Sequence, residues 1–227
     1  MPRRSATRAS GRLSREGIVA AAIGLADRDG LDGLSMRRLA QHLGVDAMSI
    51  YYHVRDKEAL LGEMADAVAA AIPDAPRDGE WTQRLRALIM DARRAMLRHP
   101  WAVRVFEGRA TPGPAVLRHI ERVLAVMRDG GCSVDLSHHA LHLLGSRILG
   151  FSQDLFDDSS GAEPTEASSW AETMPHVAEL AAAVTHGGAL GGCDDDGEFA
   201  FALDLLLDGL ERRRLSRYER MPLPVIK

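Results

Sequence analysis

The sequence predicts an all-α protein, and three observations support this fold class. Ala, Leu and Arg, which lose little free energy in a helix, dominate the 227 residues, whereas aromatic residues make up only 5%. Apolar residues recur three and four positions apart along most of the chain, and no stretch alternates as a strand would. Short segments that contain Gly or Pro separate the periodic stretches, as turns between helices do.

Four helices are expected within residues 14–72, behind a basic arm at 1–13 whose Arg-, Ser- and Ala-rich composition predicts disorder. Each helix begins at a residue whose side-chain oxygen can cap the first amides. These capping residues are Ser14, Ser35, Asp46 and Asp56, and the expected helices span 14–29, 35–43, 47–53 and 57–72. Gly44 should end the second helix in a positive-φ conformation.

The segment 73–79 (PDAPRDG) is the clearest linker in the chain, and a domain boundary is expected there. Beyond it, periodic stretches predict helices at 81–98, 101–107, 113–129, 133–157, 170–184 and 198–216. The expected organisation is a basic arm (1–13), an N-terminal domain (14–72) and a larger helical domain (80–227).

The net charge of −4 is unevenly distributed along the chain. Residues 1–57 hold ten Lys/Arg and six Asp/Glu, and the remaining eighteen and twenty-six follow them. A basic head on an acidic body indicates a polyanionic partner for the head, although a solvated tail is the alternative interpretation.

The cellular compartment is suggested by what the sequence lacks. Cys132 and Cys193 have no metal or redox spacing, which favours a reducing compartment. No apolar run approaches the ~18 residues of a membrane span, and the N-terminus does not resemble a secretory signal. We therefore expect a soluble, cytoplasmic protein.

Residues 35–53 form the pattern that suggests a function. Two short helices are joined by a tight turn at 44–46, and the second is too short to be stable without neighbours. Its exposed positions are expected to carry hydrogen-bonding groups, namely Ser49, Tyr51, Tyr52 and His53. Such a helix can enter the major groove of DNA, whereas an ordinary helical hairpin is the alternative.

The same region resembles the DNA-binding domain of the TetR family of bacterial repressors. The matching stretches are LSMRRLA at 34–40, LGV at 43–45, SIYYHV at 49–54 and DKEALL at 56–61. A weaker match at 199–211 (FAFALDLLLDGLE) is similar to the last helix of the tetracycline-repressor-like branch. The resemblance implies a three-helix helix-turn-helix domain followed by a helical domain for ligand binding and dimerisation.

The resemblance also implies roles for individual residues. Arg37 matches an arginine that reads a guanine edge, which is chemistry that a guanidinium performs well. Ser35 and the amides beside it are expected to hold a phosphate, and Lys57 to clamp the DNA backbone. Ser49, Tyr51, Tyr52 and His53 match contacts of the recognition helix to bases and phosphates. Ala47 and Met48 depart from the branch, so we expect them to touch thymine methyls and the operator to differ; Arg38 is either a contact or a solvated residue.

Two helices of the C-terminal body are apolar nearly all round, at 133–157 and 198–216. A helix of that kind must be covered on more than one side. The resemblance implies a homodimer in which each subunit contributes these two helices to a four-helix bundle. Burial within one large monomer is the alternative.

An effector pocket is expected among the helices of 81–184. Its candidate lining residues, each of which could also be plain core, are Trp101, Phe106, His138, His142, Phe151 and Trp170. His138 and His142 have metal-compatible i,i+4 spacing, but no third ligand is identifiable, so no metal or cofactor is expected. Phe106 stands where the branch carries a magnesium-chelating histidine, which argues against a tetracycline–metal effector.

These features together predict a ligand-responsive transcriptional regulator, most simply a repressor that binds a palindromic operator as a homodimer and is released by a small molecule. The helix at 57–72 connects head to body and is the expected lever. An activator and an architectural DNA-binding module remain as alternatives. We do not expect an enzyme, because the sequence holds no nucleophile elbow, phosphate loop or metal-ligand cluster.

Overall fold

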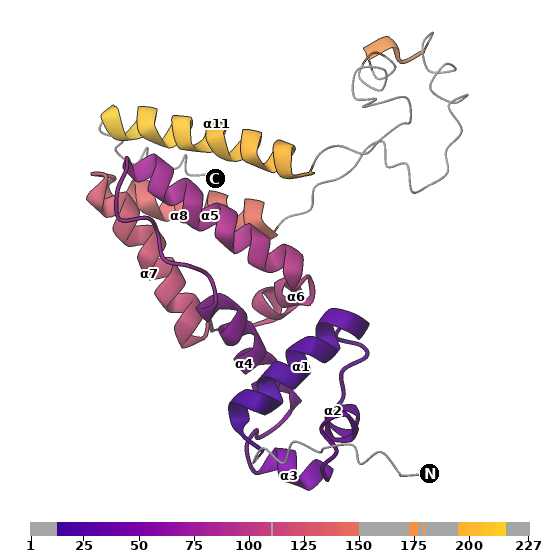
Figure 1. Cartoon of the computed structure of the whole chain (residues 1–227). Helices are drawn as coiled ribbons and strands as arrows, with labels where there is room; N and C mark the ends of the chain where they lie inside the picture. The colour runs from indigo at the N-terminus through magenta and orange to yellow at the C-terminus, as the bar shows by residue number, and fades with distance from the viewer. Residues whose placement is uncertain (1–12, 110, 150–172, 177–178, 180–194, 217–227) are drawn as a thin grey trace, which may run out of the picture. The chain divides into compact units, whose positions relative to one another are not determined.

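The computed structural model describes residues 13–109, 111–149, 173–176, 179 and 195–216, and all of its regular elements are helices (Figure 1). The chain divides into two compact units, and the division falls between Cys132 and Ser133. The first unit contains α1 to α7, and the second contains α8 and α11. The all-α fold class is therefore confirmed for the described residues.

Three short helices form the N-terminal end of the first unit: α1 (Arg15–Asp29), α2 (Met36–Leu43) and α3 (Ala47–Tyr51). α2 packs on both α1 and α3. The three helices lie together in the lower part of Figure 1. Ile18, Leu39 and Ile50, one from each helix, are fully buried. The apolar positions predicted from spacing thus form a common core.

Helix α4 (Lys57–Ala70) is the central element of the first unit. It packs on α1 and also on α5 (Trp81–Arg98), α6 (Trp101–Gly108) and α7 (Pro114–Asp129). Arg15 at the start of α1 donates two hydrogen bonds to the Glu63 carboxylate of α4, at 2.7 and 2.6 Å. α4 is therefore fixed to the N-terminal helices as well as to the helices that follow it.

The second unit contains α8 (Val134–Leu149) and α11 (Asp195–Leu215), which pack against each other. α11 buries Phe199, Leu203, Leu207 and Leu210, which lie on one helical stripe. Apolar residues also stand on its other side, where Phe201 is 64% exposed and Leu205 is 54% exposed. The second unit thus presents an apolar face that its own described residues leave open.

Most predicted helix limits agree with the structure within one residue, and three differ by two or three residues. α3 ends at Tyr51, two residues before the predicted end, because the amides of His53 and Val54 turn back to the Ile50 carbonyl. α4 ends at Ala70 rather than 72, and α11 begins at Asp195 rather than 198. The predicted helix at 170–184 and the end of the one at 133–157 lie largely outside the described residues.

The expected linker at 73–79 does not coincide with the division between compact units, because α4 and α5–α7 pack together in the first one. Residues 73–79 still separate two helices without being helical themselves. The functional division into 14–72 and 80–227 stays a prediction.

Candidate nucleic-acid interface

The turn between α2 and α3 is built by local capping. Ser35 Oγ accepts the amide of Arg38 at 3.2 Å at the start of α2. Gly44 ends α2 with φ at 68°, a left-handed conformation that favours glycine, and Asp46 then accepts the amide of Met48 at 2.8 Å. All three roles were predicted from the sequence. They fix α3, which has only five residues, beside α2.

The outward side of α3 presents large uncharged groups. Met48 is 63% exposed and Tyr52 is 88% exposed, and Tyr51 is exposed as well. Ala47, Ser49 and His53 are half-buried. Exposed tyrosines beside a buried Ile50 anchor are what a groove-reading helix requires, because base edges are read by hydrogen bonds and apolar contacts.

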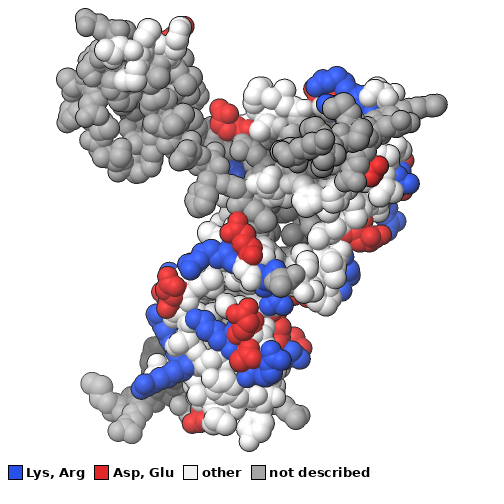
Figure 2. All heavy atoms as spheres, turned by 180° about the vertical axis from the view of Figure 1, so that it is seen from behind, with Lys and Arg blue, Asp and Glu red and all other residues white. Residues whose placement is uncertain are grey.

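The charges around this surface lie on the neighbouring elements. Figure 2 shows the lowest part of the molecule, where α3 lies in Figure 1, as largely uncharged, with basic and acidic side chains interspersed above it. Arg37 and Lys57 are both exposed. Neither forms a hydrogen bond or ion pair with any described residue, so both cations are available to a polyanion.

Arg38, by contrast, has a structural role. Its guanidinium donates to the Gly33 carbonyl at 3.0 Å and to the Asp29 carboxylate at 2.9 Å. It thereby ties the end of α1 to the start of α2. The two adjacent arginines are therefore used differently, which the sequence left open for Arg38.

Asp56 organises the start of α4, next to Lys57. Its carboxylate accepts the amide of Ala59 at 2.7 Å and the Nε–H of Arg55 at 2.7 Å. The Ala59 amide first, and Arg55 second, hold the pKa of Asp56 below its ordinary value. The carboxylate therefore remains an ionised cap at neutral pH and fixes the turn from which the Lys57 side chain projects.

An acid on α1 binds the start of α6. Asp27 Oδ1 accepts the indole Nε1–H of Trp101 at 2.6 Å and lies 2.8 Å from Nδ1 of His99. The Trp101 ring is buried. This cluster, which we call the Asp27 clamp (Asp27, His99 and Trp101), connects an N-terminal helix directly to α6.

Two further contacts join α4 to α7 in a reciprocal manner. On α4, Asp66 Oδ1 accepts the amides of Ala115 and Val116 at 3.0 and 3.3 Å, and so caps the first turn of α7. On α7, Arg122 Nη1 donates to the carbonyl of Ile72, just beyond α4, at 3.0 Å. Each helix thus satisfies backbone groups at one end of the other.

The same arginine brings a histidine into the contact. Arg122 also donates to Asp74 at 2.6 Å, and its Nη2 lies 3.2 Å from Nδ1 of His119. Burial, and secondarily the charge of Arg122, lower the pKa of His119 to about 4. His119 is therefore neutral at pH 7, and its Nδ1 accepts the guanidinium proton.

The residues predicted for the effector pocket belong to both units, and two of them lie outside the described residues. Trp101 belongs to the Asp27 clamp, and Phe106 is half-buried on α6. His138 and His142 are exposed on α8, with ring centroids 4.7 Å apart. Phe151 and Trp170 lie outside the described residues. Their part in an effector pocket stays a prediction.

None of the described groups of His, Cys, Asp and Glu has three or more members placed to hold a metal ion. No described helix is both long and apolar enough to cross a membrane.

Sequence reasoning did not identify the acids and the arginine that join helices, namely Asp27, Asp66 and Arg122. Each looks like an ordinary surface charge in the sequence, because its partners lie about 50 to 75 residues away. The only available signal was that Gly113 and Pro114 begin a helix without a polar side chain to cap it. That absence calls for a cap from elsewhere in the fold.

Comparison with known proteins supports this reading of the geometry. Residues 18–64 match the family described as bacterial regulatory proteins of the tetR family, and residues 72–214 match the tetracyclin repressor-like C-terminal domain. The HTH-type transcriptional repressor DrrR1 of Streptomyces coeruleorubidus is 30% identical over 209 residues, covering 88% of this chain and 77% of the relative. The class D tetracycline repressor protein of Escherichia coli is 31% identical over 205 residues, covering 88% and 90%.

Solved structures show the same architecture. ActR of Streptomyces coelicolor in complex with actinorhodin superposes with a TM-score of 0.71 at 28% identity, covering 88% of this chain and 96% of that one. Apo ActR gives a TM-score of 0.70 at 27% identity, covering 92% and 100%. From its helix-turn-helix and from matches that span most of its length, the chain belongs to the TetR family of bacterial regulators, with a C-terminal domain of the tetracycline-repressor-like kind.

Proposed function

We propose that this protein is a transcriptional repressor that binds a palindromic operator and leaves it when a small molecule binds. The observation that carries the proposal is the surface of α3, where Met48, Tyr51 and Tyr52 are exposed while Ile50 anchors the helix. The reading residues we propose are those predicted from the sequence: Ser35, Arg37, Ala47, Met48, Ser49, Tyr51, Tyr52, His53 and Lys57. Relatives named as repressors support this choice over an activator and over a catalytic role.

Ser35 is expected to contribute through its hydroxyl and through the amides beside it. Its Oγ accepts the Arg38 amide, which leaves the O–H to donate to a phosphate at this end of α2, together with the amides of the first turn. Arg37 has no competing acid among the described residues, and its guanidinium can donate two parallel hydrogen bonds to guanine. Lys57 contacts the DNA backbone as a point charge.

The operator-binding form is a homodimer, as is typical of the family. We place the interface on the outer faces of α8 and α11, because Leu143 on α8 and Phe201 and Leu205 on α11 are exposed apolar side chains. A second copy would cover this apolar face. It would also supply the second reading head that successive major grooves require.

The effector acts by shifting a conformational equilibrium. Contacts from α4 to α6 and α7 connect the expected lever, α4, to the helices that follow the linker. The Asp27 clamp connects α1 to α6 as well. An effector that favours one arrangement of these helices changes operator affinity by its differential affinity for the two arrangements and by no more. ActR has been solved with actinorhodin, which makes an organic small molecule a suitable effector class for this chain too. Acting on DNA in a bacterium, the protein would work in the cytoplasm.

The proposal is tested by selecting bound sequences from random duplex DNA with the full-length protein. We expect an enriched palindrome whose half-sites are about one helical turn apart. Binding to this palindrome, followed by fluorescence anisotropy, should be at least about a thousandfold tighter than to scrambled DNA at the same salt concentration. Enrichment of no motif, or of a motif without two-fold symmetry, would contradict the proposal.

A further inference from the structure

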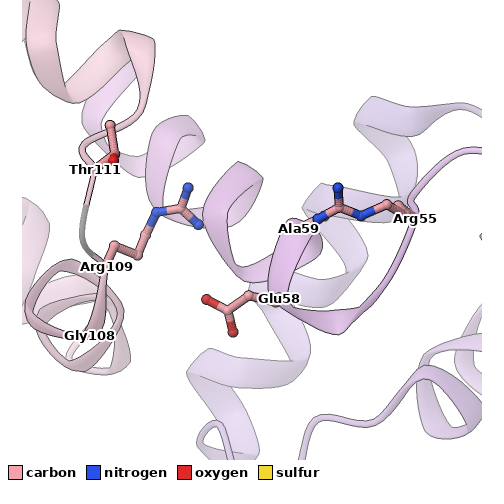
Figure 3. A pocket seen from close by; sticks show the side chains of 6 residues that line it. All are labelled: Arg55, Glu58, Ala59, Gly108, Arg109 and Thr111. Carbon is pink, nitrogen blue, oxygen red and sulfur yellow. The ribbon is translucent and has the colours of Figure 1, made fainter.

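A cleft of about 280 Å³ opens between the start of α4 and the end of α6 (Figure 3). It does not include any of the residues predicted for the effector pocket. Its described lining comes from the start of α4 and the residue before its cap (Arg55, Glu58 and Ala59), and from the end of α6 and the turn after it (Gly108, Arg109 and Thr111). This lining places two guanidinium groups, one hydroxyl and one carboxylate around a single opening.

Arg109 is the half-buried cation of this cleft. Its guanidinium lies against the backbone of Gly62, one turn further along α4, in space that a Cβ on residue 62 would occupy. The guanidinium forms no hydrogen bond or ion pair with any residue that the structure describes. A cation partly withdrawn from water without an anion beside it is unfavourable, so this arrangement favours an added anion.

Two other groups can act as donors in the same cleft. Arg55 uses its Nε–H for Asp56 at 2.7 Å, which leaves its terminal nitrogens available. Thr111 is exposed and offers a hydroxyl. In Figure 3 the two guanidinium groups face the opening from its two ends, and the Glu58 carboxylate lies below both.

Glu58 opposes anion binding without neutralising the site. It forms no ion pair with Arg55 or Arg109. Its negative charge should therefore weaken the attraction of the cleft for an anion, but it does not take the anion's place beside the arginines. Removing the Glu58 charge should therefore strengthen anion binding, whereas removing an arginine should weaken it.

We propose that the cleft is a binding site for a small oxyanion, the phosphate, sulfate or carboxylate group of a small molecule, held mainly by Arg109 with help from Thr111 and Arg55. Its volume is just below the usual range of ligand pockets, about 300–1,000 Å³, which suits a compact ion. A bound oxyanion would join the first turn of α4, which carries Lys57, to the end of α6. An oxyanion bound there, outside the predicted effector pocket, would thereby restrict movement of α4.

The test is a titration of the full-length protein with inorganic phosphate, at constant pH and ionic strength, followed by calorimetry and by amide chemical shifts. We expect saturable binding, with shifts concentrated at residues 55–62 and 108–113. Arg109→Gln should weaken phosphate binding by about tenfold or more, because it removes a charge-assisted hydrogen bond. Gly62→Ala should also weaken it, since the new methyl group displaces the guanidinium.

Two further variants decide between the proposal and its alternatives. Glu58→Gln should tighten phosphate binding several-fold, and this sign test holds even where an arginine variant folds poorly. Arg104 lies on α6 but does not line the cleft, so Arg104→Gln should leave the affinity for phosphate unchanged. Equal phosphate binding by Arg109→Gln and the unmodified protein would mean an adventitious ion only. Loss of operator affinity in Arg109→Gln without any phosphate binding would mean a DNA contact, and either result would overturn the proposal.

Discussion

Asp27 and Trp101 are joined by a hydrogen bond of 2.6 Å from the indole nitrogen to the carboxylate, across 74 residues of sequence. The bond links α1, which supports the reading helices, to α6, which belongs to the helices that follow the linker. The pair matters because a signal from an effector must reach α3 through such contacts. Further connections run through α4, which packs on α1, α6 and α7, and through Arg104 of α6, whose guanidinium lies 3.9 Å from the Asp32 carboxylate in the turn after α1.

Trp101→Phe removes this hydrogen bond and keeps most of the packing. We expect a loss of about 1–3 kcal/mol in the free energy of unfolding, because a charged acceptor loses a buried donor. We also expect a smaller effect of effector on operator affinity, because one connection between α1 and α6 is gone. Chemical denaturation measures the first quantity, and anisotropy with labelled operator measures the second. A variant with unchanged stability and an unchanged effector response would show that the bond has no role.

Asp66 caps α7 from α4, so Asp66→Ala should cost about 1 kcal/mol of unfolding free energy, the usual value of a lost cap. Asp66→Asn keeps an acceptor oxygen and should restore most of that loss. If the cap also transmits the effector signal, Asp66→Ala should change the effector dependence of operator binding more than Asp66→Asn does. Identical behaviour of the two variants in both assays would rule out this account.

Local features of the fold were predictable because they depend on neighbours in sequence. Ser35, Gly44 and Asp46 each act within three residues, and capping rules therefore identified α2, the turn and α3. The end of α3 was missed because its last turn depends on the Ile50 carbonyl accepting two amides, a detail that helix periodicity does not carry.

Tertiary features of the site were harder to predict. Arg37 and Arg38 are adjacent and chemically identical, yet only Arg38 is held by Asp29 and the Gly33 carbonyl. Which arginine turns toward α1 depends on the packing angle of two helices. The cleft around Arg109 depends on the absence of a side chain at Gly62, and nothing near either residue in the sequence pairs them.

The difference between the arginines gives a matched test of DNA reading. Arg37→Ala should relax specificity at one base pair of each half-site, at a cost of about 1–3 kcal/mol for the cognate base. Lys57→Ala should weaken all sequences about evenly and reduce the salt slope by about one. Arg38→Ala is the control: it should lower stability, with little change in base preference. Equal losses on cognate and scrambled DNA for Arg37→Ala would contradict the assignment.

The exposed apolar face of α11 leads to a prediction about assembly. Leu205→Glu places a charge where we expect a second copy, and it should convert the dimer to monomer at micromolar concentration in sedimentation velocity. Operator affinity should fall with it, because two heads no longer bind together. Asp78→Lys is a suitable control, since it changes an exposed charge outside α8 and α11. A fully dimeric Leu205→Glu protein would place the interface elsewhere.

His119 should make the α4–α7 contact weaken in acid. Its pKa is lowered to about 4 in the folded protein, from an ordinary value near 6.5, so the unfolded chain takes up the proton first as the pH falls. The stabilising contribution of neutral His119 is therefore complete above pH 6.5 and decreases between about pH 6.5 and pH 4, by about 2 kcal/mol after allowance for partial exposure. Protonation also removes the acceptor for Arg122 and places two cations together.

Urea unfolding at pH 7.5 and pH 5 checks this dependence. His119→Gln keeps an acceptor for Arg122 and cannot titrate in this range, so its stability should change less between the two pH values than that of the unmodified protein. His176→Gln, which alters a fully solvated histidine, should retain the original pH dependence. The same loss on acidification in all three proteins would assign it to groups other than His119.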